Sequence, residues 1–200
     1  MEHEHNQINL CGVLAELPGY SHENRGKRFY RFPLELERLS GAVDILPVLV
    51  PESVLCAMDL SGGDMLEVSG QIRTFNNRTQ NGRRLVISVY AERLVSCQGE
   101  PRNDVQLTGT ICKEPIYRQT PMGREICDVM LAVNRPYHRA DYIPCIFWGR
   151  MANLVRSCTV GCMLQLTGRL QSREYIKVLG EESERRTAYE VSAMTAEILE

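Results

Sequence analysis

The sequence predicts an all-β protein in which two copies of one small five-stranded barrel follow each other along the chain. Three observations carry this prediction: an internal repeat with a nearly constant offset, apolar and polar residues that alternate over most of each copy, and one short helical pattern at the same place in both. The chain of 200 residues is long enough for two cores of about 100 residues each.

The repeat sets the expected domain organisation. Adding 97 to a residue number in the first part of one copy gives its match in the other, and the offset grows by one further along. Near the ends an offset of 105 pairs Ala91 with Ala196. A polar stretch with Gly and Pro separates the copies and is typical of a linker. We therefore expect two domains, copy one at residues 1–98 and copy two at residues 103–200.

Strands are expected wherever apolar residues recur at every second position. In copy two, Val105, Leu107 and Ile111 alternate with polar residues, and four later segments show the same period. Gly12 and Gly109 interrupt the first strand of each copy and fit a barrel, in which a strand must bend sharply. The expected strands are 105–111, 127–133, 142–148, 163–172 and 189–198, with counterparts in copy one that include 8–14, 65–74 and 85–94.

A short helix is expected between the third and fourth strands of each copy. Apolar residues recur at helical spacing over residues 149–157, and Pro51 opens the equivalent segment 51–58, at a position where its missing N–H costs least. Three strands, one helix and two strands are the order of the OB-fold, a Greek-key barrel whose exposed face binds oligonucleotides or oligosaccharides. The fold by itself does not decide the ligand.

Composition narrows the class of protein. The formal net charge of −2 excludes a uniformly basic coat for nucleic acid, so any surface for phosphate must be local. No apolar run reaches the ~20 residues that span a bilayer, and residues 1–6 show no basic leader, so we expect a cytoplasmic protein. The eight cysteines are spread through apolar stretches and are expected to be reduced.

The sequence contains no motif that predicts a metal site or a reaction. Cys158 and Cys162 are four apart, but no Cys-x2-Cys pair occurs and the four histidines stand in unrelated contexts. A phosphate-binding glycine loop with lysine, Gly-x-Ser-x-Gly and His-Glu-x-x-His are all missing from the sequence. A thiol pair of Cys145 with His138 is disfavoured because alternation turns Cys145 inward. We expect no metal, no cofactor and no enzyme.

Five strings of copy two, taken in their order, form a specific signal. They are Val105-x-Leu-Thr-Gly109, Leu131-Ala-Val-Asn-Arg135, Asp141-Tyr-Ile-Pro-Cys-Ile-Phe-Trp-Gly149, Leu166-Thr-Gly-Arg-Leu-Gln-Ser-Arg173 and Thr187-Ala-Tyr-Glu-Val191. Through them copy two resembles the DNA-binding domain of bacterial single-stranded DNA-binding proteins. Copy one resembles the same family more distantly, through residues 9–12 and 68–72. The resemblance implies sequence-independent binding of single-stranded DNA in replication, recombination or repair.

The resemblance also implies an assembly. Some members of the family carry two such domains on one chain, and two chains then supply four OB-folds, so we expect a homodimer. Housekeeping members continue past the barrel into an acidic tip that recruits other enzymes, whereas this sequence stops at Glu200, directly after the last expected strand. We therefore expect no recruitment through such a tip, and two roles stay open, the general cellular coat and an accessory protein of a plasmid, phage or primosome.

Sequence-independent binding of single strands needs flat π surfaces for bases and cations spaced for phosphates. Tyr142 and Trp148 are six apart on one expected strand, roughly 20 Å at ~3.3 Å per residue, and alternation turns both away from the apolar side. The alternative for such rings is core or interface packing, which we expect for Phe147. We expect Tyr142 and Trp148 to stack on bases.

Further contacts to single-stranded DNA are expected around these two rings. Arg169 and Arg173 share the outward face of strand 163–172 and its continuation. Tyr175 follows in a loop or, if the strand continues, on the same outward face. Tyr137 and Arg135 belong to the hairpin that precedes strand 142–148. In the resemblance, the positions at which the family carries base-stacking aromatics are those of Tyr137, Tyr142, Trp148 and Tyr175.

Copy one departs from this pattern. The positions matched to the four rings hold Ser40, Ile45, Pro51 and Asn77, so its stacking platform is largely missing. It keeps positive charge, because residues 71–84 contain four arginines and no acid, and a second basic run covers residues 25–31. A solvated loop is the alternative for both runs. From the first run we expect contacts to the DNA strand from Arg73, Phe75 and Arg84.

A second function remains open. The OB-folds could mainly hold a replication protein, as in a primosome-type adaptor like the primosomal replication protein n, which is similar to this family. The slightly negative net charge favours this alternative.

Overall fold

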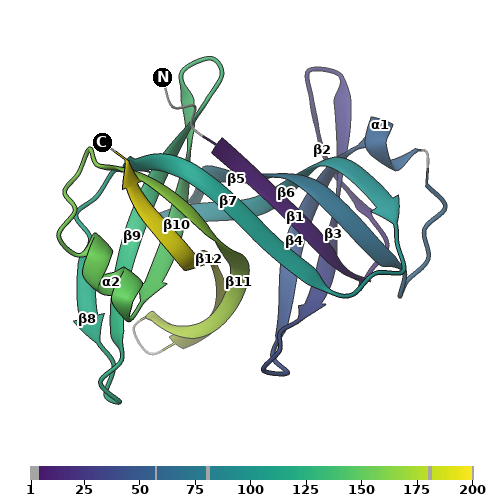
Figure 1. Ribbon diagram of the computed structural model, residues 1–200. Helices are drawn as coiled ribbons and strands as arrows, with labels where there is room; N and C mark the ends of the chain where they lie inside the picture. Colours follow the sequence, from purple (N-terminus) through teal and green to yellow (C-terminus); the bar gives the residue numbers. More distant parts are fainter. Residues whose placement is uncertain (1–4, 57, 80–81, 180–181, 200) are drawn as a thin grey trace.

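The computed structural model describes residues 5–56, 58–79, 82–179 and 182–199. Over these ranges all strands belong to one sheet, and two short helices lie outside it. Figure 1 shows copy one, in purple to blue, beside copy two, in teal to yellow. Copy one contains β1 (His5–Leu14), β2 (Gly19–Asn24), β3 (Lys27–Glu37), β4 (Val43–Pro51), α1 (Glu52–Leu55), β5 (Met65–Thr79) and β6 (Gly82–Ser96), and copy two contains β7 (Arg102–Ile111), β8 (Ile116–Gln119), β9 (Glu125–Arg135), β10 (Arg139–Trp148), α2 (Arg150–Val155), β11 (Met163–Leu179) and β12 (Glu182–Leu199).

Each copy closes into a ring of five strands in the described part of the chain. In copy one, β1 pairs with β5 along most of its length and with β3 at its end, and β4 pairs with β6 in parallel. Copy two repeats these pairings with β7, β11 and β9 and with the parallel pair β10–β12. A Cβ on Gly12 would lie 2.5 Å from the carbonyl oxygen of Glu35, and one on Gly109 would lie 2.7 Å from that of Ala132. The ring therefore needs glycine at both positions, and the predicted OB-fold class is confirmed.

The structure adds two features to the expected elements. Strands β2 and β8 are short additional strands, each paired with the strand that follows it. The hairpins β5–β6 and β11–β12 are longer than expected, because β5 runs to Thr79 and β11 to Leu179. Past the ring each hairpin continues as a two-stranded arm with no core beneath it. Apolar and polar residues therefore need not alternate in the arms, and the expected strands ended too early. The helices end at Leu55 and Val155, short of the expected segments.

Strand register corrects the repeat near the ends of the copies. Gly70 faces Ala91 in copy one, and Gly168 faces Ala193 in copy two. Ala91 therefore corresponds to Ala193 with an offset of 102, and the expected match of Ala91 with Ala196 is wrong. The reason is the arm of copy two, in which each strand extends two residues further than in copy one.

The copies are joined through β1 and β7, which pair antiparallel over seven residues. Ile8 faces Val105, its own match at the offset of 97, so a two-fold axis relates the copies and passes between these residues. Figure 1 shows the two strands crossing the middle of the molecule side by side. Because the sheet runs through both copies, the domain limits 1–98 and 103–200 stay a prediction.

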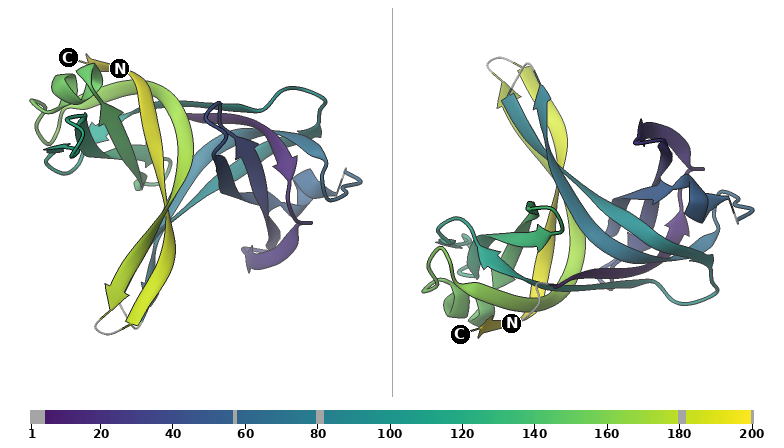
Figure 2. Two further views of the ribbon diagram at one scale, coloured as in Figure 1. Left: turned by 90° about the horizontal axis from the view of Figure 1, so that it is seen from below. Right: turned by 90° about the horizontal axis from the view of Figure 1, so that it is seen from above.

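Two buried aspartates fasten each copy to the long hairpin of the other. Asp44 on β4 accepts hydrogen bonds from the backbone N–H of Ser172 on β11 and from Nε of Arg38, both at 2.7 Å. Asp141 on β10 repeats the contact, because its Oδ1 accepts the backbone N–H of Thr74 on β5 at 2.7 Å. Figure 2 shows the two arms crossing and leaving the barrels in the same direction.

Each ring encloses an apolar core. Phe32 in copy one and Phe147 in copy two are among the largest fully buried side chains, so the expected inward position of Phe147 is confirmed. Cys145 is also buried, and all eight cysteines are free thiols. Neither helix in the described part of the chain has the length and hydropathy needed to cross a membrane.

Candidate nucleic-acid interface

Strand β10 presents two rings to solvent. Ile143 and Phe147 are buried, whereas Tyr142 is 44% and Trp148 is 37% exposed, so the predicted outward orientation of both rings is confirmed. Trp148 ends the strand, and Gly149 then turns the chain toward α2 with a positive φ of 52°, a conformation that glycine adopts without strain. The indole lines a groove.

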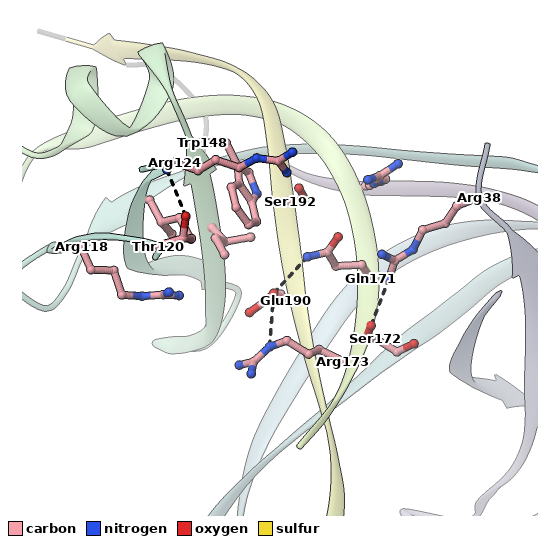
Figure 3. A pocket seen from close by; sticks show the side chains of 13 residues that line it. Arg38, Arg118, Thr120, Arg124, Trp148, Gln171, Ser172, Arg173, Glu190 and Ser192 are labelled. Atoms are coloured by element: carbon pink, nitrogen blue, oxygen red, sulfur yellow. Dashed lines mark hydrogen bonds and ion pairs between the residues drawn. The ribbon is translucent and has the colours of Figure 1, made fainter. Parts of the chain in front are cut away.

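The groove beside Trp148 has a volume of about 660 Å³ and a basic lining (Figure 3). Among the described residues that line it, five are arginines and one, Glu190, is acidic. Ile126 and Ile146 add apolar surface. One π surface, apolar side chains and several cations in an open groove can hold bases and phosphates at the same time. The five arginines are Arg38, Arg118, Arg124, Arg169 and Arg173.

These arginines differ in how firmly they are held. Arg118 pairs with a carboxylate on β9 at 2.9 Å, and Arg173 lies 3.9 Å from Glu190, but both guanidinium side chains are about half exposed. Exposed ion pairs contribute at most about 1 kcal/mol, so a phosphate can replace the carboxylate. Arg124 and Arg169 have no carboxylate partner among the residues that the structure describes. They are the groups most available to an incoming anion.

A second cavity of about 520 Å³ lies between the two arms, where residues 85–87 of β6 and 186–189 of β12 line it. Pro144 and Tyr175 line it, and the ring of Tyr175 lies 5.9 Å from the guanidinium carbon of Arg173. Of the two positions expected for Tyr175, the loop is wrong and the continued strand is confirmed, because β11 runs to Leu179. Arg173 also lines the groove beside Trp148, so a residue of the groove lies next to a ring that lines the second cavity.

Tyr137 and Tyr142 stand apart from both cavities. Tyr137 lies in the turn between β9 and β10 with a positive φ of 65° and is 92% exposed, which confirms its expected loop position. Tyr142 is anchored through its backbone N–H, which donates to Oγ1 of Thr74 at 2.7 Å. Neither ring is among the described linings of the two cavities, so the structure brings together Trp148, Arg169, Arg173 and, through Arg173, Tyr175.

Arg135 and Arg73 are turned toward the buried Asp141 instead of the groove. Nε of Arg135 lies 3.2 Å and Nη1 of Arg73 lies 3.0 Å from Oδ2 of Asp141. Burial lowers the pKa of Arg135, although the Asp141 charge opposes that shift, and a guanidinium stays protonated at neutral pH. Two arginines, one from each copy, thus balance the negative charge of Asp141 where the copies meet.

The remaining expected contacts lie on the arm of copy one. Phe75 is 55% exposed on β5 and faces Val86 of β6. Arg84 faces Asn77 in the same ladder, but its side chain lies outside the described residues.

Sequence reasoning missed three of the groove arginines. Arg118 and Arg124 flank the turn between β8 and β9, and the alternation predicts no strand that would place them. Arg38 belongs to copy one and reaches the groove because it donates to the carbonyl oxygen of Ser172 on the crossing arm, at 3.0 Å. The repeat could have drawn attention to Arg38, because it matches Arg135, an expected DNA contact, at the offset of 97.

Comparison with known proteins addresses the family. The model of the single-strand binding protein family matches residues 102–199. Single-stranded DNA-binding protein B of Bacillus subtilis (strain 168) is 36% identical over 80 residues, which cover 36% of this chain and 71% of that protein. The chain belongs to the single-strand binding protein family. The family is named for the binding of single strands, which agrees with the prediction that the chain is not an enzyme.

Other members cover different shares of the chain. Single-stranded DNA-binding protein 1 of Lactococcus lactis is 34% identical over 86 residues, which cover 40% of this chain and 57% of that protein, so this chain spans little more than half of that relative. The solved structure of the wild-type single-stranded DNA binding protein from Thermus aquaticus matches with a TM-score of 0.82 and 21% identity over 100% of this chain and 95% of that chain. At this identity the match shows the fold, and it includes both copies.

Proposed function

We propose that this member of the single-strand binding protein family binds single-stranded DNA without sequence preference, through the groove beside Trp148. The observation that carries the proposal is a partly exposed indole next to five arginines and one glutamate, in a protein whose net charge is negative. Positive charge is thus concentrated where a ring is available. The names of the relatives from Bacillus subtilis and Lactococcus lactis support the same ligand.

Each part of the site then has a task. Bases stack on Trp148 and Tyr142, while Arg124 and Arg169 bind phosphates without first breaking an ion pair within the described protein. Arg118 and Arg173 exchange their carboxylates for phosphates, and release of condensed ions from the DNA makes binding weaker as salt rises. Further along the bound DNA, stacking or phosphate contacts come from Tyr137, Tyr175, Phe75 and Arg84. Arg73 joins the copies through Asp141, which Arg135 contacts within copy two.

Titration with fluorescent oligo-dT at about 50 and about 200 mM salt tests the proposal. We expect tight binding at low salt, a marked loss at high salt, and quenching of the emission of Trp148, the one tryptophan in the chain. Trp148→Ala and Tyr142→Ala should each weaken binding by about 1–3 kcal/mol for each stacked base. Leu154→Ala is the matched control, because Leu154 is also 37% exposed but lies on α2. Unchanged affinity in both ring variants would remove this face from the proposal.

The assembly and the cellular role are part of the same proposal. We infer that two chains associate into a homodimer with four OB-folds, acting in the cytoplasm in replication, recombination or repair. Weak binding of oligo-dT that does not respond to salt would favour the other candidate, an adaptor whose OB-folds hold a replication protein. The net charge of −2 is the observation that keeps this alternative in the test.

A further inference from the structure

Copy one carries a row of aromatic rings that its sequence match to copy two does not predict. His22 on β2 stacks on Phe29 of β3, with ring centroids 5.0 Å apart and planes inclined by 14°. Phe29 in turn lies 6.4 Å from Tyr90 on β6, and the guanidinium carbon of Arg73 lies 5.9 Å from the ring centre of Tyr90. We call this row the copy-one ladder. It crosses the sheet from β2 to β6 and ends on a cation.

Strand register places the ladder on the face that forms the Trp148 groove in copy two. Phe29 corresponds to Ile126, because each faces the last residue of the neighbouring strand, β4 or β10. Tyr90 corresponds to Ser192, because their partners on β5 and β11 are related by the repeat. Ile126 and Ser192 both line the groove. Copy one has no ring at the end of β4 but carries rings on the strands at either side, β3 and β6.

Cations flank the ladder along β3. Lys27, Phe29 and Arg31 alternate on one face of this strand, and both cations are exposed. Neither has a carboxylate partner among the described residues. The neighbouring Arg28 is different, because it pairs with Glu52 at 3.3 Å. The face of the ladder therefore offers a cation, a ring and a second cation at successive positions.

Arg73 is held in place over the ladder. Its Nη1 donates to Oδ2 of Asp141 at 3.0 Å, and Asp141 belongs to copy two. The contact that joins the copies thus also fixes the guanidinium beside Tyr90. A ring that faces a fixed cation can stack on a base without ordering either group on binding.

We infer that copy one holds a second base-stacking surface for single-stranded DNA, formed by His22, Phe29 and Tyr90, with Lys27 and Arg31 as its phosphate contacts. The inference rests on the proposed function of the chain, and it replaces the expectation that the stacking platform of copy one is largely missing. Bases stack along the ladder because every base has a π face, so no sequence preference arises. A strand long enough to leave the groove beside Trp148 then has a second place to bind on the same chain.

Variants of the full chain test the inference. Phe29→Leu and Tyr90→Leu remove the π faces and keep apolar bulk. Tyr20→Leu is the control, because Tyr20 lies on the same short strand as His22 but packs edge-on against Tyr30, at 6.0 Å and 83°. Affinity is measured by anisotropy with labelled oligo-dT of about 8 and about 35 nucleotides, since one OB-fold takes about 4–16 nucleotides. Emission of Trp148 reports separately on copy two.

We expect each leucine variant to lose about five- to 150-fold in affinity for the long oligonucleotide. Quenching of Trp148 by the short oligonucleotide should be unchanged, and the Tyr20→Leu control should bind as the wild type does. Full affinity for the long oligonucleotide in both leucine variants, together with a loss in Trp148→Ala, would overturn the inference and leave the proposed function intact. A wild-type chain that binds neither oligonucleotide would overturn both.

Photocrosslinking provides a reading that does not depend on variants. A bromodeoxyuridine oligonucleotide of about 35 nucleotides is irradiated with the wild-type chain, and the adducts are located by mass spectrometry. We expect adducts on peptides from β2 or β3 as well as on peptides that contain Trp148. Adducts confined to copy two would contradict the inference even if the leucine variants fail to fold.

Discussion

Single residues decide where the strands of this protein can cross. Gly70 and Gly168 lie next to the irregularities in register of β5 and β11. A Cβ on Gly70 would collide with the carbonyl oxygen of Tyr90, and one on Gly168 with that of Ser192. In both cases the obstacle is backbone, which cannot move aside as a flexible side chain can.

Alanine at either glycine should therefore destabilise the fold. We expect Gly70→Ala and Gly168→Ala each to lower the free energy of unfolding by about 1–3 kcal/mol, measured by urea denaturation. Gly19→Ala is the control, because nothing lies within 4 Å of a Cβ built there. A loss of the same size in the control would show that the close contacts are not the cause.

Thiol reactivity is a second property set by single residues. Burial raises the pKa of the Cys145 thiol far above its ordinary value and raises that of Cys11 to about 11, with Cys97 as hydrogen-bond partner adding to the second shift. Cys56 is exposed. Hydrogen bonds from Thr159 lower the pKa of Cys162, which is only partly buried. Because the thiolate is the reactive form, iodoacetamide at neutral pH should label Cys56 and Cys162 and spare Cys145 and Cys11 in the native protein.

Peptide mass spectrometry of the alkylated protein checks this order. Cys56→Ser and Cys162→Ser identify the fast labels, and unfolding in urea should make Cys145 as reactive as the others. Rapid labelling of Cys145 in the native state would contradict its position in the core and would reopen the thiol pair with His138.

At the scale of elements, the crossing arms depend on the carboxylate of Asp44. Burial by itself would raise the pKa of Asp44, but hydrogen bonds from Arg38 and Ser172 outweigh it and hold the pKa below its ordinary value. The carboxyl group has a pKa of about 4 in the unfolded chain and a lower pKa in the folded chain. The contribution of Asp44 to stability is thus complete above about pH 5 and is lost as the pH falls through the lower folded pKa.

Asp44→Ala tests this contact. Removing one partner of a buried ion pair costs about 3–5 kcal/mol, so the variant should unfold at lower urea concentration at pH 7 and should lose less stability than the wild type on acidification. Glu37→Ala is the control, because Glu37 is an exposed acid on β3. An acid dependence that is the same in Asp44→Ala and in the wild type would contradict the role given to Asp44.

The sequence predicts the strands of the rings better than those of the arms. Alternation predicted the strands of both rings, because a core beneath one face imposes the period of two. It stopped short in the arms, where residues 173–176 of β11, which include Tyr175, are exposed on both faces of the strand. The groove was predicted in part, through Trp148, Arg169 and Arg173. Arg38 was missed because its place depends on how the copies cross, and Tyr90 because its partners lie on other strands.

At the scale of the whole molecule, the two-fold relation inside the chain bears on its assembly. Copies one and two already pair through β1 and β7, so a partner chain must use another surface. We expect light scattering at micromolar concentration to give twice the chain mass of 22.7 kDa. A mass of one chain at that concentration would reject the homodimer, while the affinity of a single chain for oligo-dT would remain a separate question.

Because β1 and β7 pair within one polypeptide, the interface between the copies differs from one between two identical subunits. When two identical subunits form such an interface, every mutation appears in both halves, and low concentration separates them. Here the halves are covalently tethered, so their local concentration does not fall when the protein becomes scarce. Each half can also differ in sequence from the other, so one half carries Trp148 and the other carries His22, Phe29 and Tyr90.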